Sequence, residues 1–491
     1  MRASVNVDAQ MKPGKRARFA TCALALVLGA SLVSFLAPAD AYADVRKSDL
    51  IAGKSVEERG VAAIKCPSID AEFAMLVDSD GFVYFERNAD VSAQIASVTK
   101  VMTAVVAMDE APADVVVTVS AAAAAVGESS AHLQEGDSMS LETALKALML
   151  PSGNDAAYAI AESVGATLVQ QAKQEGASIT AADGSTVDLN ADDAGYRAFV
   201  AAMNAKAGEL GCENSLFTNP HGLDDGEWAD ELHSCASDVA KIVAHAMSDE
   251  LFRSIVSTDA ATIQVTRDGA TANVDLESTD ALLGVYEGAC GVKTGYTDLA
   301  GSCFAGAVSK EGKTLYSVVL HSTSDVKRFE DTTTLWDWAY DNLVSYPLAS
   351  SAESTSMNLG GQTREVPVIA YAPLASWIDK TVKVTLADPD ASVEVFALNG
   401  NVSQEISLDE IAGSVAAGDV VGRAVFYQNN EVVASADLIA CEDVPAPGVL
   451  EGIGIWWDRL VRGFTGQPTC ADAKIINSTP LIYDKQSTYA S

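Results

Sequence analysis

Three short polar motifs occur in order along this chain, and their spacing constrains the fold more than any other feature. Ser-Val-Thr-Lys occupies residues 97–100, Ser-Gly-Asn occupies 152–154 and Lys-Thr-Gly occupies 293–295. Each motif alone is weak, because a serine three residues before a lysine arises about once or twice by chance in a chain of this length. Residues 324–327 are such a chance repeat. Together the motifs supply the groups of a serine acyl-transfer enzyme, provided that one fold unites them.

Composition limits the class of protein. The chain has 491 residues, 48% of them hydrophobic, which is enough for two or three domains with proper cores. Its 32 basic and 67 acidic residues give a formal charge of −35. Nucleic-acid binding requires clustered Lys and Arg, so no nucleic-acid partner is expected. The cysteines form no CxxC pair and the five histidines form no HExxH motif, so we expect neither a metal site nor a cofactor.

The N-terminus has the layout of a secretory signal peptide. Basic residues up to Arg18 precede an apolar run from Phe19 to Ala37, and Ala-Tyr-Ala at 41–43 is a small-x-small cleavage site. We therefore expect residues 1–43 to be a signal peptide and the protein to be exported. The alternative is an uncleaved anchor, because nearly 20 apolar residues are long enough to span a bilayer.

Export makes the remaining cysteines candidates for disulfides. Seven remain after the signal peptide, and an odd number leaves at least one unpaired. Cys290 and Cys303 flank the third motif and are one candidate pair, which could link two neighbouring strands. Cys212 and Cys235 bracket a loop around His221.

The pattern of apolar residues predicts an α/β catalytic domain over residues 44–346, an antiparallel sheet with helices. Alternating and continuous apolar runs predict strands at 72–77, 82–85, 291–294, 303–308 and 315–320. Helical spacing predicts helices at 98–108, 141–149, 155–164 and 328–342. Pro151 ends the second helix, so Ser152 is expected on a loop. Residues 170–193 are expected to form a surface insertion.

The remaining chain predicts a smaller β-rich domain and a terminal helix. Residues 347–361 are rich in small residues and are expected to be a linker; 362–445 alternate apolar and polar residues in short runs and are expected to be a β-rich pedestal. Residues 446–466 predict an amphipathic helix with Trp and Phe on one face, and 467–491 a polar tail. The helix suits burial at a lipid interface, but the same stripe could pack on the β-rich domain.

The first two motifs suggest how the nucleophile is activated. Ser97 needs a base, and Lys100, three residues along a helix, lies on the same face. To accept a proton this lysine must be neutral, which burial and a second cation, Lys293, would favour. Ser152 is the candidate to relay a proton between Lys100 and the leaving amine, and Asn154 to hold a substrate amide.

The third motif suggests how the substrate is held. Thr294 would contact a substrate carboxylate while Lys293 sets the local field, and Gly295 removes a side chain so that an extended peptide can lie along the strand edge. The backbone amides of Ser97 and Tyr296 are our candidates for the oxyanion hole.

Four segments carry a family resemblance: residues 96–100, 151–157, 219–223 and 291–297. Together they resemble the D-alanyl-D-alanine carboxypeptidases, the low-molecular-weight penicillin-binding proteins. The resemblance implies a β-lactamase/transpeptidase-like fold and peptidoglycan stem pentapeptides as substrates. It also implies release of the terminal D-Ala through an acyl-enzyme on Ser97, and acylation by β-lactam antibiotics. These enzymes often carry a β domain and a terminal amphipathic helix, which implies a peripheral position on the outer face of the cell membrane.

Three features affect how far the family's residue roles can be transferred to this chain. Ser237 stands where some members carry a cation near the substrate carboxylate, so more of the binding is expected to fall on Lys293 and Thr294. The insertion at 170–193 is expected to affect access to the cleft. His221 lies in Asn-Pro-His-Gly-Leu, which reads as a structured loop, not as the position of a catalytic base.

Two other functions remain open at this point. A serine β-lactamase uses similar motifs but usually needs a glutamate to activate the deacylating water, and it needs neither a pedestal nor a terminal anchor. A non-catalytic cell-wall-binding scaffold of the same fold is disfavoured, because all three motifs are complete.

Overall fold

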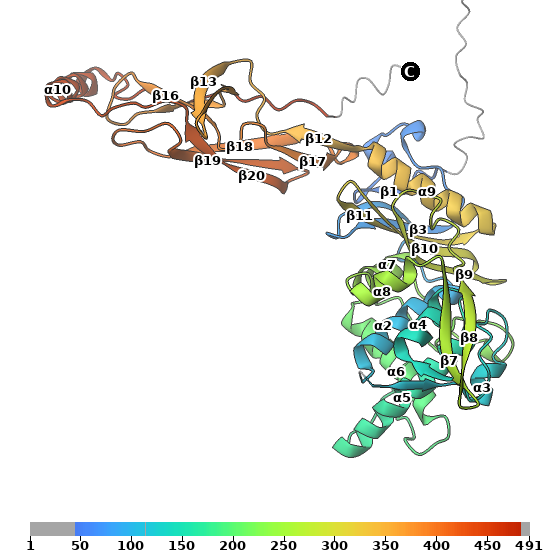
Figure 1. The fold of residues 1–491 in the computed structure, drawn as a ribbon. Coiled ribbons are helices and arrows are strands. Elements are labelled where there is room, and N and C mark those ends of the chain that lie inside the picture. Colours follow the sequence, from blue (N-terminus) through green and yellow to red (C-terminus); the bar gives the residue numbers. More distant parts are fainter. Residues whose placement is uncertain (1–44, 113, 483–491) are drawn as a thin grey trace, which may run out of the picture. The chain divides into compact units, whose positions relative to one another are not determined.

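The computed structural model describes residues 45–112 and 114–482. The predicted signal peptide and the last nine residues of the expected polar tail lie outside the described residues. Figure 1 shows the arrangement of helices and strands.

A seven-stranded antiparallel sheet forms the framework of the first half of the described chain. Its order is β2-β1-β4-β3-β11-β10-β9, so the N-terminal hairpin pairs with strands more than two hundred residues away. β9 is the last strand at one edge. The strands are β1 (Leu50–Ile51), β2 (Lys54–Ser55), β3 (Phe73–Asp78), β4 (Val83–Arg87), β9 (Ala289–Thr297), β10 (Gly301–Lys310) and β11 (Lys313–Ser322).

Helices cover both faces of this sheet. Successive side chains of a strand point to opposite faces, so each central strand contributes side chains to both cores. On β11, Leu315 and Val319 join the core cluster that contains Trp336 of α9 (Asp325–Asp341). Val318 and Leu320 join the other core, together with residues of α2, α4, α5 and α7. α9 and α7 therefore lie on opposite faces of the sheet (Figure 1).

The helical part lies between β4 and β9 in sequence and contains a small second sheet. This sheet has the order β5-β6-β7-β8. Its strands are β5 (Val116–Thr118), β6 (Ser138–Ser140), β7 (Ala260–Arg267) and β8 (Ala270–Glu277). The helices are η3 (Ala96–Thr99), α2 (Lys100–Glu110), α3 (Ala121–Ala125), α4 (Leu141–Met149), α5 (Asn154–Glu175), α6 (Ala194–Glu209), η4 (Gly226–Trp228), α7 (Ala236–Ala246) and α8 (Glu250–Val256). Two short helices, α1 (Val56–Arg59) and η2 (Ala63–Lys65), precede β3.

The structure corrects the bounds of the expected insertion. α5 continues to Glu175, so residues 170–175 are helical, and the irregular segment begins at Gly176, whose φ of +65° ends the helix. Its Thr180 pairs with Thr186 in an isolated bridge.

The C-terminal part is β-rich, and the predicted α/β class followed by a β region is confirmed. β12 (Leu343–Pro347) follows α9 closely and pairs with β17 (Ser392–Phe396). A six-stranded antiparallel sheet has the order β18-β19-β20-β16-β15-β21. Its strands are β15 (Ala370–Pro373), β16 (Thr381–Leu386), β18 (Val402–Leu408), β19 (Val420–Gln428), β20 (Glu431–Ala440) and β21 (Lys474–Ile475). A short helix, η5 (Ala397–Asn399), follows β17.

Two expected segments differ in the structure. The stretch 347–361, expected to be a linker, contains β13 (Ser354–Leu359), which forms a hairpin with β14 (Gln362–Pro367). The polar tail is partly docked: β21 pairs with β15, and the buried Asn477 side chain donates a hydrogen bond to Leu348 O at 2.9 Å.

α10 (Val449–Thr465) has no buried residue. Its exposed apolar residues are Val449, Leu450, Ile453, Trp456, Trp457, Leu460, Val461 and Phe464. The guanidinium of Arg459 donates to Trp377 O at 3.0 Å, and this contact joins the helix to the β-rich part. Within residues 45–112 and 114–482, no helix combines the length and the apolar character needed to cross a membrane.

The seven described cysteines are all free thiols. The candidate link between Cys290 and Cys303 is not formed, for a geometric reason. β9 and β10 are neighbours, but the register pairs Cys303 with Gly295 and Val308 with Ala289, so the two thiols lie at opposite ends of the ladder.

The contact between α5 and α6 gives a test of the packing. A Cβ added to Gly165 would lie 1.8 Å from the carbonyl oxygen of Gly195, whereas one added to Gly208, also helical, would meet nothing within 4 Å. We expect Gly165→Ala to lower the free energy of unfolding by about 3 kcal/mol, because two backbones must separate. Gly208→Ala is the matched control and should raise it by about 0.5–1 kcal/mol. Urea unfolding measures both, and equal effects would contradict the close approach.

Candidate active site

The first motif lies where a short 3-10 turn meets a helix. Ser97 is in η3 and Lys100 is the first residue of α2. In a 3-10 turn, side chains three residues apart are eclipsed. This places Lys100 Nζ 2.8 Å from Ser97 Oγ and explains why the spacing is three residues.

Lys100 is fully buried and has a complete set of contacts. Besides the Ser97 hydroxyl, Nζ lies 2.7 Å from Asn154 Oδ1 and 2.7 Å from the backbone oxygen of His221. A neutral amine has two hydrogens and one lone pair, so it can donate to the two carbonyl oxygens and accept from the hydroxyl of Ser97. Burial, and next the charge of Lys293, hold the pKa of Lys100 well below its usual value. The geometry and the electrostatics therefore favour a base at this position.

The second lysine is also buried. Lys293, on β9, is 1% exposed, and its Nζ donates to Thr294 O at 2.8 Å. Burial, followed by the charge of Arg328, lowers the pKa of Lys293 to about 7. Burial disfavours a charge on either amine, and the charge of Lys293 further disfavours a charge on Lys100, so the pair favours a neutral Lys100.

The second motif forms the tight connection between α4 and α5. Ser152 has a φ of +64°, and Gly153 precedes α5. A Cβ added to Gly153 would lie 2.7 Å from Ala147 O, so this position has no room for a side chain. Ser152 is 4% exposed, and its Oγ has no hydrogen-bond partner among the described residues. The side-chain amide nitrogen of Asn154 donates a hydrogen bond to Gly127 O at 3.0 Å. This contact orients the side-chain oxygen of Asn154 toward Lys100.

The third motif lies on the edge strand. Thr294 Oγ1 is 2.6 Å from Thr279 Oγ1, so two hydroxyls lie together. A Cβ added to Gly295 would come within 3.0 Å of Ser97 N, so the glycine lets β9 approach the turn that holds the nucleophile. Tyr296 directs an exposed ring outward, and its hydroxyl donates to Asp298 Oδ1 at 3.0 Å.

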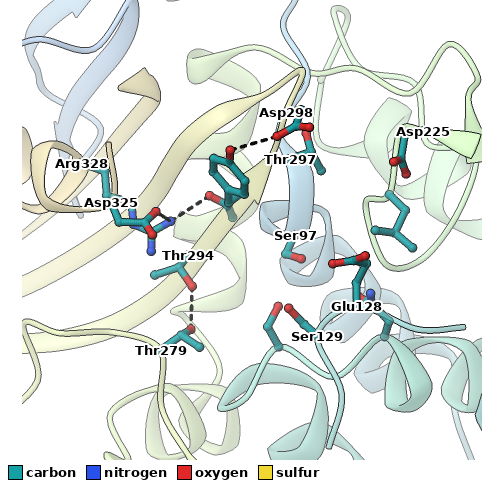
Figure 2. A pocket seen from close by; sticks show the side chains of 15 residues that line it. Ser97, Glu128, Ser129, Asp225, Thr279, Thr294, Thr297, Asp298, Asp325 and Arg328 are labelled. Carbon is teal, nitrogen blue, oxygen red and sulfur yellow. Dashed lines mark hydrogen bonds and ion pairs between the residues drawn. The ribbon is translucent and has the colours of Figure 1, made fainter. Parts of the chain in front are cut away.

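These groups line a cleft of about 350 Å³ (Figure 2). The predicted residues Ser97, Ser152, Asn154, Thr294, Gly295 and Tyr296 all contribute to its wall. Lys100 and Lys293 are buried beneath the wall and are not part of it. The remaining lining residues are Glu128, Ser129, Leu223, Asp225, Thr279, Thr297, Asp298, Asp325 and Arg328.

Arg328 lines the cleft but was not among the residues predicted from the sequence. It lies in the first turn of α9, donates to Gly295 O at 3.0 Å and pairs with Asp325 at 3.1 Å. The chance repeat at 324–327 adjoins it, but no sequence signal marked the arginine, because only the packing of α9 on the sheet brings it to the cleft. Ser237, considered above as the position of a cation in some family members, does not line the cleft. Its hydroxyl donates a hydrogen bond to Asp90 Oδ1 at 2.6 Å. Arg328 provides the cation at the Thr294 end.

His221 has a structural position. Its ring is fully buried, and Nδ1 accepts a hydrogen bond from the backbone N–H of Leu223 at 3.3 Å. Trp228 packs edge-on against it with ring centroids 4.5 Å apart. Burial, followed by the charge of Lys100, holds its pKa well below the usual value. Its contribution to the site is the backbone oxygen that contacts Lys100.

No residue of the expected insertion, 170–193, lines the cleft. The loop of residues 127–133 borders the cleft instead. Hydrogen bonds to Asp155, at the start of α5, hold this loop in place.

Comparison with known proteins agrees with the motifs. The model of peptidase family S11, described as D-alanyl-D-alanine carboxypeptidase, matches residues 60–170 and 173–324, more than half of the chain. The D-alanyl-D-alanine carboxypeptidase of Streptomyces sp. strain K15 is 31% identical over 300 residues, 59% of this chain and 94% of that protein. DacF of Bacillus subtilis is 25% identical over 392 residues, 78% of this chain and 87% of DacF.

Among solved structures, the Streptomyces K15 DD-transpeptidase covers 56% of this chain and 98% of its own, with 31% identity and a TM-score of 0.48. The family model matches more than half of the chain, and the curated Streptomyces carboxypeptidase is 31% identical with 94% of its length covered. The chain belongs to the D-alanyl-D-alanine carboxypeptidase family of serine peptidases, the low-molecular-weight penicillin-binding proteins.

Proposed function

We propose that this protein is a serine D-Ala-D-Ala carboxypeptidase that removes the terminal D-Ala from peptidoglycan stem pentapeptides and is acylated by penicillin. One observation carries the proposal. A buried amine, Lys100, lies 2.8 Å from the Ser97 hydroxyl and is held there by two carbonyl oxygens. Lysine in this setting is a base for a serine nucleophile.

Acylation uses Ser97, Lys100 and the edge of the sheet. Neutral Lys100 Nζ accepts the hydroxyl proton as Ser97 Oγ bonds to the carbonyl carbon of the scissile peptide bond. The negative charge that develops on the carbonyl oxygen is stabilised by the backbone N–H groups of Ser97 and Tyr296. The close approach of Gly295 to Ser97 N supports this role for the two amides.

Collapse of the tetrahedral intermediate breaks the bond to the terminal residue. The nitrogen of the departing D-Ala needs a proton, and we assign the relay from Lys100 to Ser152. Its buried Oγ, which has no partner in the described structure, is free to accept a proton and donate one in the cleft. Hydrolysis of the ester then regenerates Ser97, with water as the second nucleophile. Asn154 keeps Lys100 in place throughout.

The terminal carboxylate fits the end of the cleft that carries positive charge. The hydroxyls of Thr294 and Thr279 and the guanidinium of Arg328 line that end, and Lys293 lies beneath it. A carboxylate there accepts hydrogen bonds from the hydroxyls and interacts with the cations. This requirement makes the enzyme a carboxypeptidase, because only a chain end presents a free carboxylate beside the scissile bond.

We further propose that the protein acts outside the cytoplasm and attaches to the outer face of the cell membrane through α10. A cleaved signal peptide at 1–43 accounts for export. A catalytic domain at 44–346 is followed by a β-rich pedestal, and the exposed apolar stripe of α10 supplies the contact with lipid.

Replacement of the nucleophile tests the reaction. Ser97→Ala should lower kcat for D-Ala release at least about 10³-fold and abolish the adduct with labelled penicillin, because no oxygen is left to acylate. Mass spectrometry detects both the shortened peptide and the penicillin adduct. Ser324→Ala is the matched control, since Ser324 begins a similar four-residue segment but caps α9. It should retain the adduct; an adduct on Ser97→Ala would contradict the proposal.

The pH dependence of acylation tests the lysine pair. The second-order rate constant of penicillin acylation should fall as pH falls through the lowered pKa of Lys100, because protonated Lys100 cannot accept a proton. Lys293 carries charge below about pH 7 and helps to lower that pKa. In Lys293→Met this repulsion is absent, so the pKa of Lys100 rises and the acid limb should move to higher pH. Lys146→Met, which removes a surface lysine, is the control and should leave the acid limb at the same pH. If the two variants showed the same pH profile, the electrostatic coupling of Lys293 to Lys100 would be contradicted.

Vesicle flotation tests the membrane contact. The purified protein should bind neutral phosphatidylcholine vesicles and stay bound at high salt, because apolar burial is not screened. Replacing both Trp456 and Trp457 by Ser should release it. Asp458→Asn, which removes a charge paired with Arg462 on the same helix, is the control and should leave binding intact. Release of the unaltered protein by salt would contradict this proposal.

A further inference from the structure

The segment between β8 and β9 contains a buried carboxylate that the proposed reaction does not use. Asp280 is 5% exposed. Its Oδ1 accepts a hydrogen bond from the backbone N–H of Leu282 at 2.9 Å, and its own backbone N–H donates to Ser278 Oγ at 3.2 Å. Its second oxygen, Oδ2, is buried and has no hydrogen-bond partner among the described residues. Such an oxygen is unfavourable unless nearby charges compensate for its burial.

Asp280 lies beside the cationic end of the cleft. The preceding residue, Thr279, contacts two other elements: its backbone N–H donates to Leu150 O at the end of α4, at 3.1 Å, and its hydroxyl lies 2.6 Å from Thr294 Oγ1 on β9. Figure 2 shows the two threonines together on the side of the cleft that carries Arg328. These contacts hold the start of the segment against β9, and Asp280 itself is not among the residues that line the cleft.

Lys293 is a buried cation whose described hydrogen-bond acceptors are both neutral. Its Nζ lies 2.8 Å from Thr294 O and 3.5 Å from Thr294 Oγ1. An ammonium group carries three hydrogens and a full charge, which these two oxygens do not neutralise. Arg328 is also buried, and its Nε has no partner in the described part of the chain. Two buried cations and an unpartnered carboxylate oxygen therefore occur at the same end of the cleft.

The charges of Asp280 and Lys293 are coupled. Burial raises the pKa of Asp280 to about 6, while the charges of Lys293 and Arg328 act in the opposite direction. Burial, followed by the charge of Arg328, lowers the pKa of Lys293 to about 7, and Asp280 acts to raise it. The other charged or titratable groups that face the pair are Arg328 on α9, Lys100 on α2, Cys290 on β9 and Asp259 before β7. Among these groups, the negative charge of Asp280 is the influence that favours a protonated Lys293.

We propose that Asp280 is a positioning residue for substrate binding, the counter-ion that keeps Lys293 protonated and so keeps the cleft charged for the terminal carboxylate of the peptide. The proposal rests on the carboxypeptidase function proposed above. Its consequence is that carboxylate binding weakens as Lys293 loses its proton, at a pH set by a residue outside the cleft wall.

Two ligands that differ only in their C-terminal charge test the proposal: Nα,Nε-diacetyl-Lys-D-Ala-D-Ala and its C-terminal amide. Ligand-observed NMR titration of Ser97→Ala gives Kd for both without turnover, and the ratio of the two values isolates the contribution of the carboxylate. We expect the acid to bind at least about tenfold more tightly than the amide below about pH 6, the effect of a charge-assisted interaction. The ratio should fall as pH rises through about 7, where Lys293 loses its charge.

Asp280→Asn in the same background removes the charge and keeps an acceptor for the Leu282 N–H. The midpoint of the fall should move about one pH unit lower, because the charged form of Lys293 loses the neighbour that favours it. At low pH the acid should bind at least as tightly as before, whereas a merely structural role would weaken it at every pH. Asp259→Asn removes the same charge from an exposed neighbour and is the matched control, which should leave the midpoint in place.

The protein with Ser97 intact supplies the remaining arms. If it releases no D-Ala from the acid peptide, the carboxypeptidase function fails. If it releases D-Ala but the preference for the acid is absent or constant with pH, the counter-ion role is wrong. That role is also overturned if Asp280→Asn leaves the midpoint unchanged, abolishes the fall, or shifts it no more than Asp259→Asn. Acylation by benzylpenicillin shows that each variant is folded, and Asp280→Ser, which also offers an acceptor to Leu282 N–H, should reproduce the shift.

Discussion

The site depends on the burial of one amine. Lys100 has no solvent contact, and its three neighbours are two carbonyl oxygens and the hydroxyl of Ser97. These partners come from three distant parts of the chain, the turn before α2, the start of α5 and the loop around His221. A solvated lysine would be protonated at neutral pH, so the packing of the helical core is what favours the neutral amine that the proposed base requires.

Burial of the two lysines also lowers the stability of the folded protein. The pKa of Lys293 is lowered from its usual value to about 7, so the unfolded chain binds more protons than the folded one between about pH 7 and 10.5. Stability from this group therefore increases as pH rises through that window, and at lower pH the folded protein holds a charge that burial disfavours. Lys100 acts in the same direction. The core clusters on both faces of the sheet must offset this cost.

The sequence predicted the parts of the fold that local patterns determine. The strands around Phe73, Phe304 and Val318, and the helix ended by Pro151, follow from apolar runs and breakers, and the motif residues follow from known chemistry. The packing of distant elements was not predictable in this way. Arg328 enters the cleft because α9 covers the sheet, and Glu128 because Asp155 ties its loop to α5. The irregular composition of 347–361 concealed β13, whose pairing with β14 lies outside any local signal.

The free thiols have a consequence for resistance to oxidation. Six of the seven, Cys66, Cys212, Cys235, Cys290, Cys303 and Cys441, have pKa values raised above the ordinary range, chiefly by burial, so they remain protonated and react slowly. The same burial shields these six sulfur atoms from dissolved oxidants, so the folded protein should keep them unmodified in an oxidising environment.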